Sequence, residues 1–342
     1  MNRDATVPAG SPGRDKAAAV RRGFEHHRFG WADTVPWLCI AACYFLVPGY
    51  LALGTQVIIM IIFTLSLDIA LGYGGIETLG HAALFGVGAY AAGLYALHVS
   101  PEPVSGLLVA AVAAAIVALL TGAIILRTRG LTLVMLTLAV ATLIAEVAST
   151  WKSVTGGDDG LSGYQVAPVL GVFDFDFLSR TAYWYAAAAL AVVFVLAKWL
   201  INSPFGLTVR GIRDNPLRMR VIGVPVTRRL VMLYAFSGAM AGVAGGLTAQ
   251  ITKLVALDVL GLSLSANVLI MLVIGGAGRL YGAFVGAAVF VILSDRAAAV
   301  DPFNWLFVLG GVLILVVRFA PKGLLGAAQQ AAIRMTSRRP VP

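Results

Sequence analysis

Charged side chains are scarce in this sequence. Asp, Glu, Lys and Arg make up 12% of its 342 residues, whereas hydrophobic residues make up 59%. A water-soluble domain carries roughly a quarter charged residues, which cover its surface. The scarcity therefore excludes an ordinary soluble domain and indicates a chain that lies largely in lipid.

Cysteines and catalytic motifs are also sparse. Cys39 and Cys43 are the only cysteines, and their i, i+4 spacing in an apolar run favours packing over redox or metal chemistry. The nucleotide-binding loop GxxxxGK[ST] is absent, as are HExxH and CxxC. We therefore expect no catalytic residue, no metal site and no cofactor, and any ATP hydrolysis must belong to partner chains.

Apolar runs of membrane-spanning length recur from Trp37 to Phe319. A helix needs about 20 residues to cross the hydrocarbon core, and the alternating pattern of a membrane β-barrel is absent. The sequence predicts an all-α polytopic membrane domain over residues 36–320. Ten spans are expected, at 36–53, 55–72, 79–98, 104–126, 131–150, 181–200, 230–249, 259–277, 282–300 and 303–319.

The basic residues are consistent with a single orientation of these spans. Short cytoplasmic loops carry an excess of Lys and Arg. A flexible tail at 1–35, a loop at 201–229 and a tail at 321–342 are basic and are expected inside, so both termini are predicted to be cytoplasmic. The loop at 151–180, with Asp158, Asp159, Asp174 and Asp176, is expected outside. This placement explains the net charge of +9 without nucleic-acid binding.

The segment 259–300 leaves two alternatives open. Its glycines surround Arg279, so it is either two full spans or a pair of broken half-helices. A single crossing would put the basic tail outside, so the charge rule favours two crossings.

The loop at 201–229 is punctuated like a folded element. Asn215 is a good N-cap, and Pro216 suits the first helical position. Gly223 can end that helix in a left-handed conformation, and Pro225 prevents its continuation. The pattern predicts two short helices on the cytoplasmic side. A capped, basic helix pair favours docking of another protein over a loop that only sets orientation.

A few polar residues fall within the predicted spans. Glu77 and His81 lie near a predicted cytoplasmic boundary, where capping or snorkelling is inexpensive and a structural role is favoured. Asp68 and Glu146 are expected to lie deeper, and pathway and buried-pair roles remain equally open for them. The glycines Gly74, Gly75 and Gly86 either line a translocation path or allow close helix packing.

Several segments together resemble the membrane permease subunits of branched-chain amino-acid (Leu/Ile/Val) ABC importers of the high-affinity class. The resemblance covers roughly residues 50–325. The segments are "LGYGGIETLGHAALFGVGAYAAGL", "RTRGLTLVMLTLA", "SVTGGDDGLSG", "SPFGLTVRGIRDNP", "IGVPVTRRL" and "VIGGAGRLYGAFVGA". Their order and spacing make the signal specific.

The resemblance implies a ten-helix permease of the vitamin-B12-importer type (type II) in a bacterial cytoplasmic membrane. Its implied partners are a second homologous permease in a heterodimer, two cytoplasmic ATPases, a periplasmic or lipoprotein solute-binding protein and membrane lipid. The loop between the sixth and seventh helices would couple the permease to the ATPase. The matching residues are Phe205, Gly206, Arg210, Arg213, Asp214, Asn215 and Gly223.

Three functions remain in view. A permease for branched-chain or other hydrophobic amino acids is favoured, since a zwitterion with an aliphatic side chain needs few counter-charges. Urea and short-chain amide importers use closely similar subunits. A stand-alone secondary transporter or channel is less favoured, because such proteins carry a richer chain of intramembrane ionisable groups.

Overall fold

The computed structural model describes residues 34–169, 179–302, 304–320 and 323–326. The chain divides into two units, residues 1–45 and 46–342. Nearly all of the predicted tails, as well as Asp174 and Asp176 of the predicted external loop, lie outside the described residues. The first unit contains most of helix α2, Val35–Leu46, on which Cys39 and Cys43 are free and exposed.

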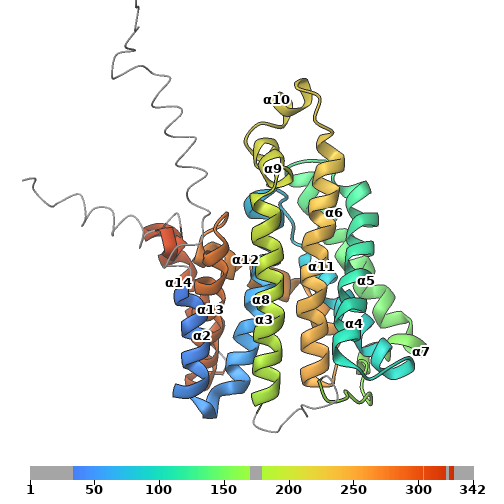
Figure 1. The fold of residues 1–342 in the computed structure, drawn as a ribbon, viewed down its shortest axis with the longest axis vertical. Helices are drawn as coiled ribbons and strands as arrows, with labels where there is room; N and C mark the ends of the chain where they lie inside the picture. Colours follow the sequence, from blue (N-terminus) through green and yellow to red (C-terminus); the bar gives the residue numbers. More distant parts are fainter. Residues whose placement is uncertain (1–33, 170–178, 303, 321–322, 327–342) are drawn as a thin grey trace, which may run out of the picture. The chain divides into compact units, whose positions relative to one another are not determined.

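The described part of the second unit is helical apart from one isolated β-bridge. Figure 1 shows its long helices running beside one another, with α9 and α10 at one end and α7 at the other. The elements are η2 (Pro48–Tyr50), α3 (Leu51–Leu67), the π-helix η3 (Asp68–Tyr73), α4 (His81–His98), α5 (Pro103–Ile125), α6 (Leu131–Thr150), α7 (Lys152–Thr155), η4 (Gly157–Asp159), α8 (Arg180–Asn202), α9 (Pro204–Asp214), α10 (Pro216–Val221), α11 (Val226–Thr252), η5 (Leu257–Leu260), α12 (Leu262–Gly275), α13 (Leu280–Val300) and α14 (Trp305–Phe319).

Each predicted apolar segment overlaps a helix among the described residues. Six helical runs are long and apolar enough to cross a membrane: Pro48–Tyr73, Pro103–Ile125, Leu131–Thr150, Arg180–Asn202, Val226–Thr252 and Leu280–Val300. In the uncertain 259–300 segment, α13 reaches this length, whereas α12 has only 14 residues. Such a helix is about 21 Å long, shorter than a hydrocarbon core of about 30 Å, so a second full span in this segment stays a prediction.

The boundary between the first two predicted spans is corrected by the structure. We placed it at Gly54, but the turn lies at Val47–Tyr50 and one helical run extends from Pro48 to Tyr73. Pro48 suits the first position of this run because its missing N–H needs no partner there. Gly54 is instead a packing position, since a Cβ on it would lie 2.8 Å from the Tyr183 ring.

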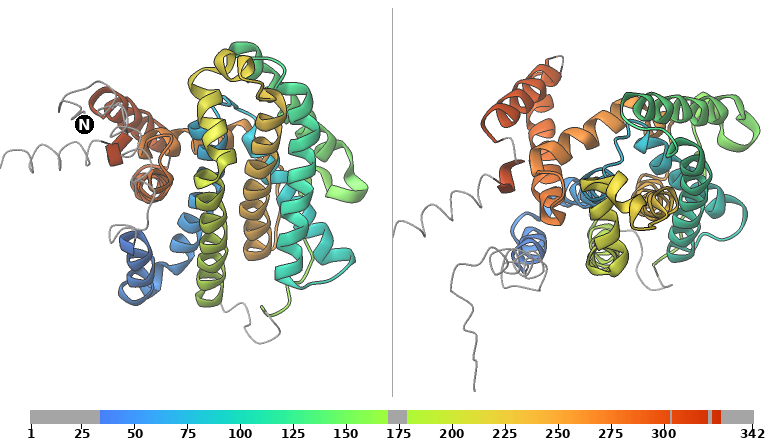
Figure 2. Two further views of the ribbon diagram at one scale, coloured as in Figure 1. Left: turned by 45° about the horizontal axis from the view of Figure 1, so that its top comes forward. Right: turned by 90° about the horizontal axis from the view of Figure 1, so that it is seen from above.

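Small residues hold α4, α5 and α11 together. Ala110, Ala114 and Ala118 of α5 are fully buried, and they face glycines at 238, 242 and 246 of α11. Gly88 of α4 meets the backbone of Gly242, so the two helices approach without intervening side chains. On the other side of α3 lie α12 and α13, as the right-hand view of Figure 2 shows.

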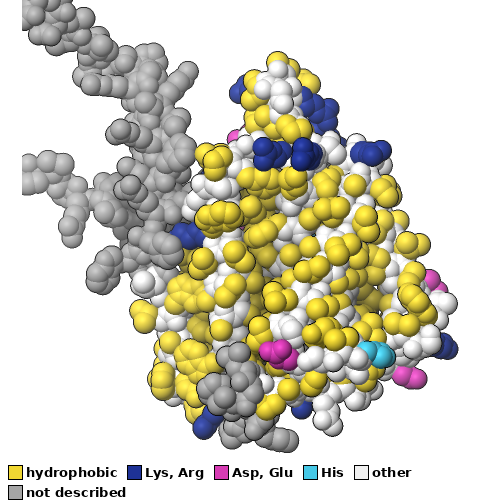
Figure 3. Space-filling view, turned by 45° about the vertical axis from the view of Figure 1, so that its right-hand side comes forward, with side chains coloured by type: hydrophobic (Ala, Val, Ile, Leu, Met, Phe, Trp, Pro, Cys, Tyr) yellow, Lys and Arg dark blue, Asp and Glu magenta, His cyan; other side chains and the backbone are white. Residues whose placement is uncertain are grey.

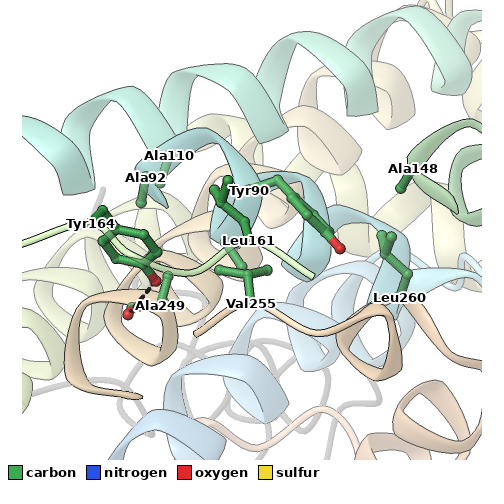
Figure 4. Close-up of a cluster of buried hydrophobic side chains, with 10 residues drawn as sticks. Tyr90, Ala92, Ala110, Ala148, Leu161, Tyr164, Ala249, Val255 and Leu260 are labelled. Carbon is green, nitrogen blue, oxygen red and sulfur yellow. Dashed lines mark hydrogen bonds between the residues drawn. The ribbon is translucent and has the colours of Figure 1, made fainter. Parts of the chain in front are cut away.

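The end of the unit opposite α9 and α10 carries a structured cap. Leu161 and Val255 pair through two backbone hydrogen bonds of 2.9 Å. Both side chains belong to a buried cluster, and the Tyr164 hydroxyl there donates to the carbonyl of Ala249 at 2.8 Å (Figure 4). Leu161 and Tyr164 lie in the segment predicted as the 151–180 loop. The described part of that loop is therefore ordered by these backbone and side-chain contacts.

Charge differs between the two ends of the second unit. In Figure 3 the flank is largely hydrophobic, basic side chains gather at the end that carries α9 and α10, and the acidic groups lie mostly toward the other end. Arg127, Arg129, Arg218 and Arg220 at the first end are exposed, as are Asp158 and Asp159 of η4. The unit is therefore an apolar bundle with one strongly basic end.

Candidate functional site

Helix α9 begins with a side-chain cap. Ser203 is the N-cap, and its hydroxyl accepts a hydrogen bond from the Gly206 N–H at 3.3 Å. Gly206 is buried, and a Cβ on it would collide with the Ile201 carbonyl at the end of α8. The guanidinium of Arg229 lies 5.4 Å from the centre of the Phe205 ring, so the start of α9 is also held by α11.

Helix α10 has a cap at each end. The Asn215 side chain accepts from the Arg218 N–H at 2.9 Å, with Pro216 at the first helical position, which confirms the predicted N-terminus. Gly223 has φ +87°, its N–H bonds to the Arg220 carbonyl, and the next N–H bonds to the Met219 carbonyl. This pair of bonds is a Schellman motif, which confirms the predicted left-handed glycine at the end. The two short helices are therefore fixed in shape.

Two arginines of α9 point back into the helical bundle. The guanidinium of Arg210 lies 5.2 Å from the centre of the Tyr73 ring, and Nη1 of Arg213 donates to the Gly72 carbonyl. Tyr73 and Gly72 both belong to the π-helix η3 at the end of the first long run. Because positions 210 and 213 are three apart, both arginines lie on one face of α9 and contact the same turn of η3.

The π-helix makes the Gly72 carbonyl available to Arg213. After η3, the N–H groups of Gly74, Gly75 and Ile76 bond to the carbonyls of Ile69, Leu71 and Ala70. The wide turn thereby leaves the Gly72 carbonyl oxygen able to accept a hydrogen bond from a side chain of another element. Such π-bulges are often found at functional sites.

The glycines of this region do two different things. Gly75 has φ +67°, and a Cβ on it would lie 3.2 Å from Arg213 Cγ, so it ends η3 and makes room for α9. A Cβ on Gly74 would collide with the Leu233 side chain, and one on Gly86 with Leu260. Both Gly74 and Gly86 are therefore packing positions in this structure.

Asp68 is fully buried, and its expected depth in the membrane stays a prediction. It lies in the last turns of the Pro48–Tyr73 run, on the same π-helix that α9 contacts. One of its carboxylate oxygens accepts from the Gly278 N–H at 2.6 Å. The backbone N–H of Arg279 is a second donor, and the charge of Arg213 also faces the carboxylate. Asp68 thus has partners from two other elements.

The other intramembrane polar residues are set apart from this cluster. His81 is fully buried, bonds to the Ser66 hydroxyl at 2.8 Å and stacks on Phe63, as the favoured structural role requires, and it does not snorkel. Glu146 is exposed one turn before the end of α6, where its carboxylate accepts from Thr150, and its expected depth stays a prediction. Glu77 is exposed.

A pocket of about 160 Å³ opens beside α9 and α10. Helix α9, the segment 74–77 and the turn between α5 and α6 form its walls, and its polar lining includes Glu77, Arg129 and Arg213. Asp214 and Asn215 are exposed next to it. Among the residues that the structure describes, no three His, Cys, Asp or Glu side chains gather as a metal site would require.

The sequence motifs identified α9 and α10 but missed their anchorage. Arg210 and Arg213 were assigned to a cytoplasmic loop that docks another protein, and nothing in the sequence linked them to η3, 141 positions before Arg213. Three close glycines at 72, 74 and 75 were the only sign in the sequence that the helix ends here.

Comparison with known proteins identifies the family. Residues 49–317 match the family described as "Branched-chain amino acid transport system / permease component". The high-affinity branched-chain amino acid transport system permease protein LivM of Salmonella typhimurium is 26% identical over 299 residues, which cover 81% of this chain and 70% of that protein. LivM of Escherichia coli is 26% identical over 315 residues, with 84% and 72% covered.

A second group of relatives matches a shorter part of the chain. The galactose/methyl galactoside import permease protein MglC of Salmonella typhimurium is 28% identical over 175 residues, which cover 48% of this chain and 49% of that protein. No solved structure matches.

The family match covers most of the described apolar helices and also α9 and α10. The six apolar membrane-span candidates agree with a protein of the inner membrane. The chain belongs to the permease components of branched-chain amino acid transport systems, and it is a transport subunit of an ABC importer rather than an enzyme.

Proposed function

We propose that this chain forms half of a transmembrane pathway for branched-chain or other hydrophobic amino acids, and that α9 and α10 receive the motion of a cytoplasmic ATPase. The single observation that carries the proposal is the rigid, basic, doubly capped helix pair at one end of an apolar bundle. A second homologous permease completes the pathway, two ATPases drive it, and a periplasmic or lipoprotein solute-binding protein delivers the solute.

The exposed face of α10 supports docking of a protein. Leu217 is 71% exposed and Val221 is 82% exposed, and Arg218 and Arg220 are exposed between them. Large apolar side chains beside arginines suit the centre of a protein interface. The neighbouring pocket, whose lining includes Glu77 and Arg129, offers charged groups to a side chain of the ATPase.

Charge supports the proposed orientation. The positive-inside rule places the end with Arg127, Arg129, Arg218 and Arg220 in the cytoplasm. The opposite end, with Asp158 and Asp159, then faces the solute-binding protein. In this orientation ten crossings return both termini to the cytoplasm, in a type II importer architecture.

Cross-linking tests the docking proposal directly. A photo-reactive amino acid at position 217, in the assembled importer in membranes, is expected to capture the ATPase subunit. Position 300 is the matched control, because Val300 is even more exposed (88%) but lies at the far end of α13. Capture from position 300 with none from position 217 would contradict the proposal.

The solute is tested by uptake. The relatives named for branched-chain amino acids cover most of this chain, and the interior is lined mainly by apolar side chains and glycine. Vesicles that contain the complete importer should accumulate leucine, isoleucine or valine when ATP is supplied. Competition by urea, acetamide or galactose, rather than by these amino acids, would assign another solute. Uptake by this chain alone without nucleotide would instead indicate a stand-alone transporter.

A further inference from the structure

The contacts of α9 do not stop at the π-helix. Asp68 and Tyr73, the first and last residues of η3, both reach the turn between α12 and α13. Asp68 binds the N–H groups of Gly278 and Arg279, and the Tyr73 side chain bonds to the backbone of Leu280. The π-helix is therefore held from one side by α9 and from the other by this turn.

The same π-helix residues receive the two arginines of α9. Arg210 covers the Tyr73 ring, and Arg213 bonds to the Gly72 carbonyl while its charge faces Asp68. Two parallel links thus run from α9 through η3 to the turn at 278–280. Residues 68 and 278 are 210 positions apart, so local chain geometry does not bring them together.

We propose that Asp68 is a positioning residue that transmits the movement of α9 to α12 and α13 during transport. The contact set Asp68, Gly72, Arg213 and Gly278 is called the Asp68 latch below. The proposal rests on the proposed function, since it assumes that an ATPase moves α9.

Close fit makes the latch specific. A Cβ on Gly72 would collide with the Asp68 carboxylate and lie 2.5 Å from the Gly278 nitrogen. Gly278 has φ +79°, and a Cβ on it would lie 3.2 Å from Arg213 Nη1 and 3.3 Å from the Gly72 carbonyl oxygen. Side chains are therefore excluded where the three elements meet, and displacement of one backbone is passed to the next rather than absorbed.

The burial of Asp68 makes its contact costly to break. The side chain is fully buried, and one carboxyl oxygen accepts from the Gly278 N–H at 2.6 Å. Its second oxygen has no hydrogen-bond partner among the described residues. Breaking the contact to Gly278 would leave buried polar groups unpaired, which is unfavourable, so the elements are held together.

The turn is connected to both helices that follow from it. A Cβ on Gly275 at the end of α12 would collide with the backbone of Gly282 in α13, and one on Gly286 with the Met271 carbonyl. The two helices touch backbone to backbone on either side of the turn. A shift of Gly278 therefore moves α12 and α13 as one hairpin.

The first test measures coupling in the complete importer in proteoliposomes. Asp68→Ala is expected to lower leucine uptake per ATP hydrolysed by about tenfold or more, the factor that corresponds to leaving a buried hydrogen-bond donor unsatisfied. Asp68→Asn keeps the shape and one acceptor oxygen, so it separates a coupling defect from misfolding and should lie between wild type and alanine. Glu102→Ala is the matched control, because it removes an exposed acid before α5, outside the latch.

The double variant sharpens this test. If Asp68 and Arg213 act in one latch, Asp68→Ala combined with Arg213→Ala should uncouple no more than Arg213→Ala alone. An unchanged uptake-to-hydrolysis ratio in both Asp68 variants, with normal amounts of complex, would overturn the proposal.

A second measurement is independent of the solute. Spin labels at Leu207→Cys on α9 and Ile292→Cys on α13 are each paired with a label at Leu120→Cys on α5, with both native cysteines replaced by serine. All three positions are exposed. A non-hydrolysable ATP analogue should change both distances in the otherwise wild-type complex, and only the 207–120 distance with Asp68→Ala.

The other outcomes identify which statement fails. If both distances still change with Asp68→Ala, the latch is wrong and the proposed function stands. If the 207–120 distance does not respond to nucleotide even with Asp68 in place, α9 is not moved by the ATPase. The proposed coupling function then fails, and the latch fails with it.

Discussion

Removal of the Asn215 cap is expected to loosen α10 without affecting α9. Helix α10 has six residues and no buried side chain, whereas isolated helices in water are marginal below about 12 residues. Its order therefore depends on its caps and on contacts such as that of Met219 over Gly211. In Asn215→Ala the Arg218 N–H loses its side-chain acceptor, which costs about 1 kcal/mol.

This magnitude sets the size of the measured effect. A loss of about 1 kcal/mol raises the population of the opened helix about fivefold. Hydrogen exchange of the α10 amides in the purified complex should accelerate by that factor, while α9, capped separately by Ser203, should keep its protection. Asn215→Ser is the control, since serine supplies an equivalent cap without added charge.

The functional readout follows from the same change. A loosened α10 should reduce cross-linking from position 217 to the ATPase and lower uptake per ATP hydrolysed, by up to about fivefold. Equal exchange rates for α10 in Asn215→Ala and Asn215→Ser would refute the reasoning, because the cap would then contribute nothing to the order of the helix.

Two further predictions concern packing and orientation. Gly88→Ala should lower the melting temperature of the detergent-purified protein, because its Cβ meets the Gly242 backbone and overpacking costs about 1–3 kcal/mol; Gly310→Ala, with nothing within 4 Å of its Cβ, should not lower it. Equal melting temperatures would contradict the α4–α11 contact. In a background in which both native cysteines are serine, Asp159→Cys should react with an impermeant maleimide on intact cells, and Leu217→Cys only after permeabilisation. The reverse pattern would invert the proposed topology.

Hydropathy and capping were enough to predict the helices but not how they meet. A run of apolar residues reports helix length, because lipid accepts any apolar side chain. Asn215, Pro216 and Gly223 act through bonds to residues within five positions, so their roles were visible in the sequence. Local chemistry was therefore sufficient for α9 and α10.

The surroundings of Asp68 and His81 required the three-dimensional structure. Asp68 meets Gly278 only because α3, α12 and α13 pack in one particular register. His81 meets Ser66, 15 positions earlier, because the segment after η3 turns back along α3. Close backbone contacts between glycines fix these registers, and a glycine in a sequence does not reveal which backbone it will touch. The sequence consequently left pathway, pairing and packing roles open at Asp68, Gly74 and Gly86.

The arginines of the coupling segment divide into two groups with separate consequences for experiment. Arg210 and Arg213 contact Tyr73 and Gly72, so substituting them loosens α9 from its own bundle. Arg218 and Arg220 are exposed on α10, so substituting them removes charge from the proposed docking face and leaves the internal links in place. Defects in the second group should therefore appear as weaker ATPase binding at low salt. The difference from wild type should shrink as salt is added, since exposed charges are screened. Defects in the first group should leave ATPase binding intact and separate hydrolysis from uptake. Loss of uptake in all four variants is thus compatible with two causes, and the affinity for the ATPase distinguishes them.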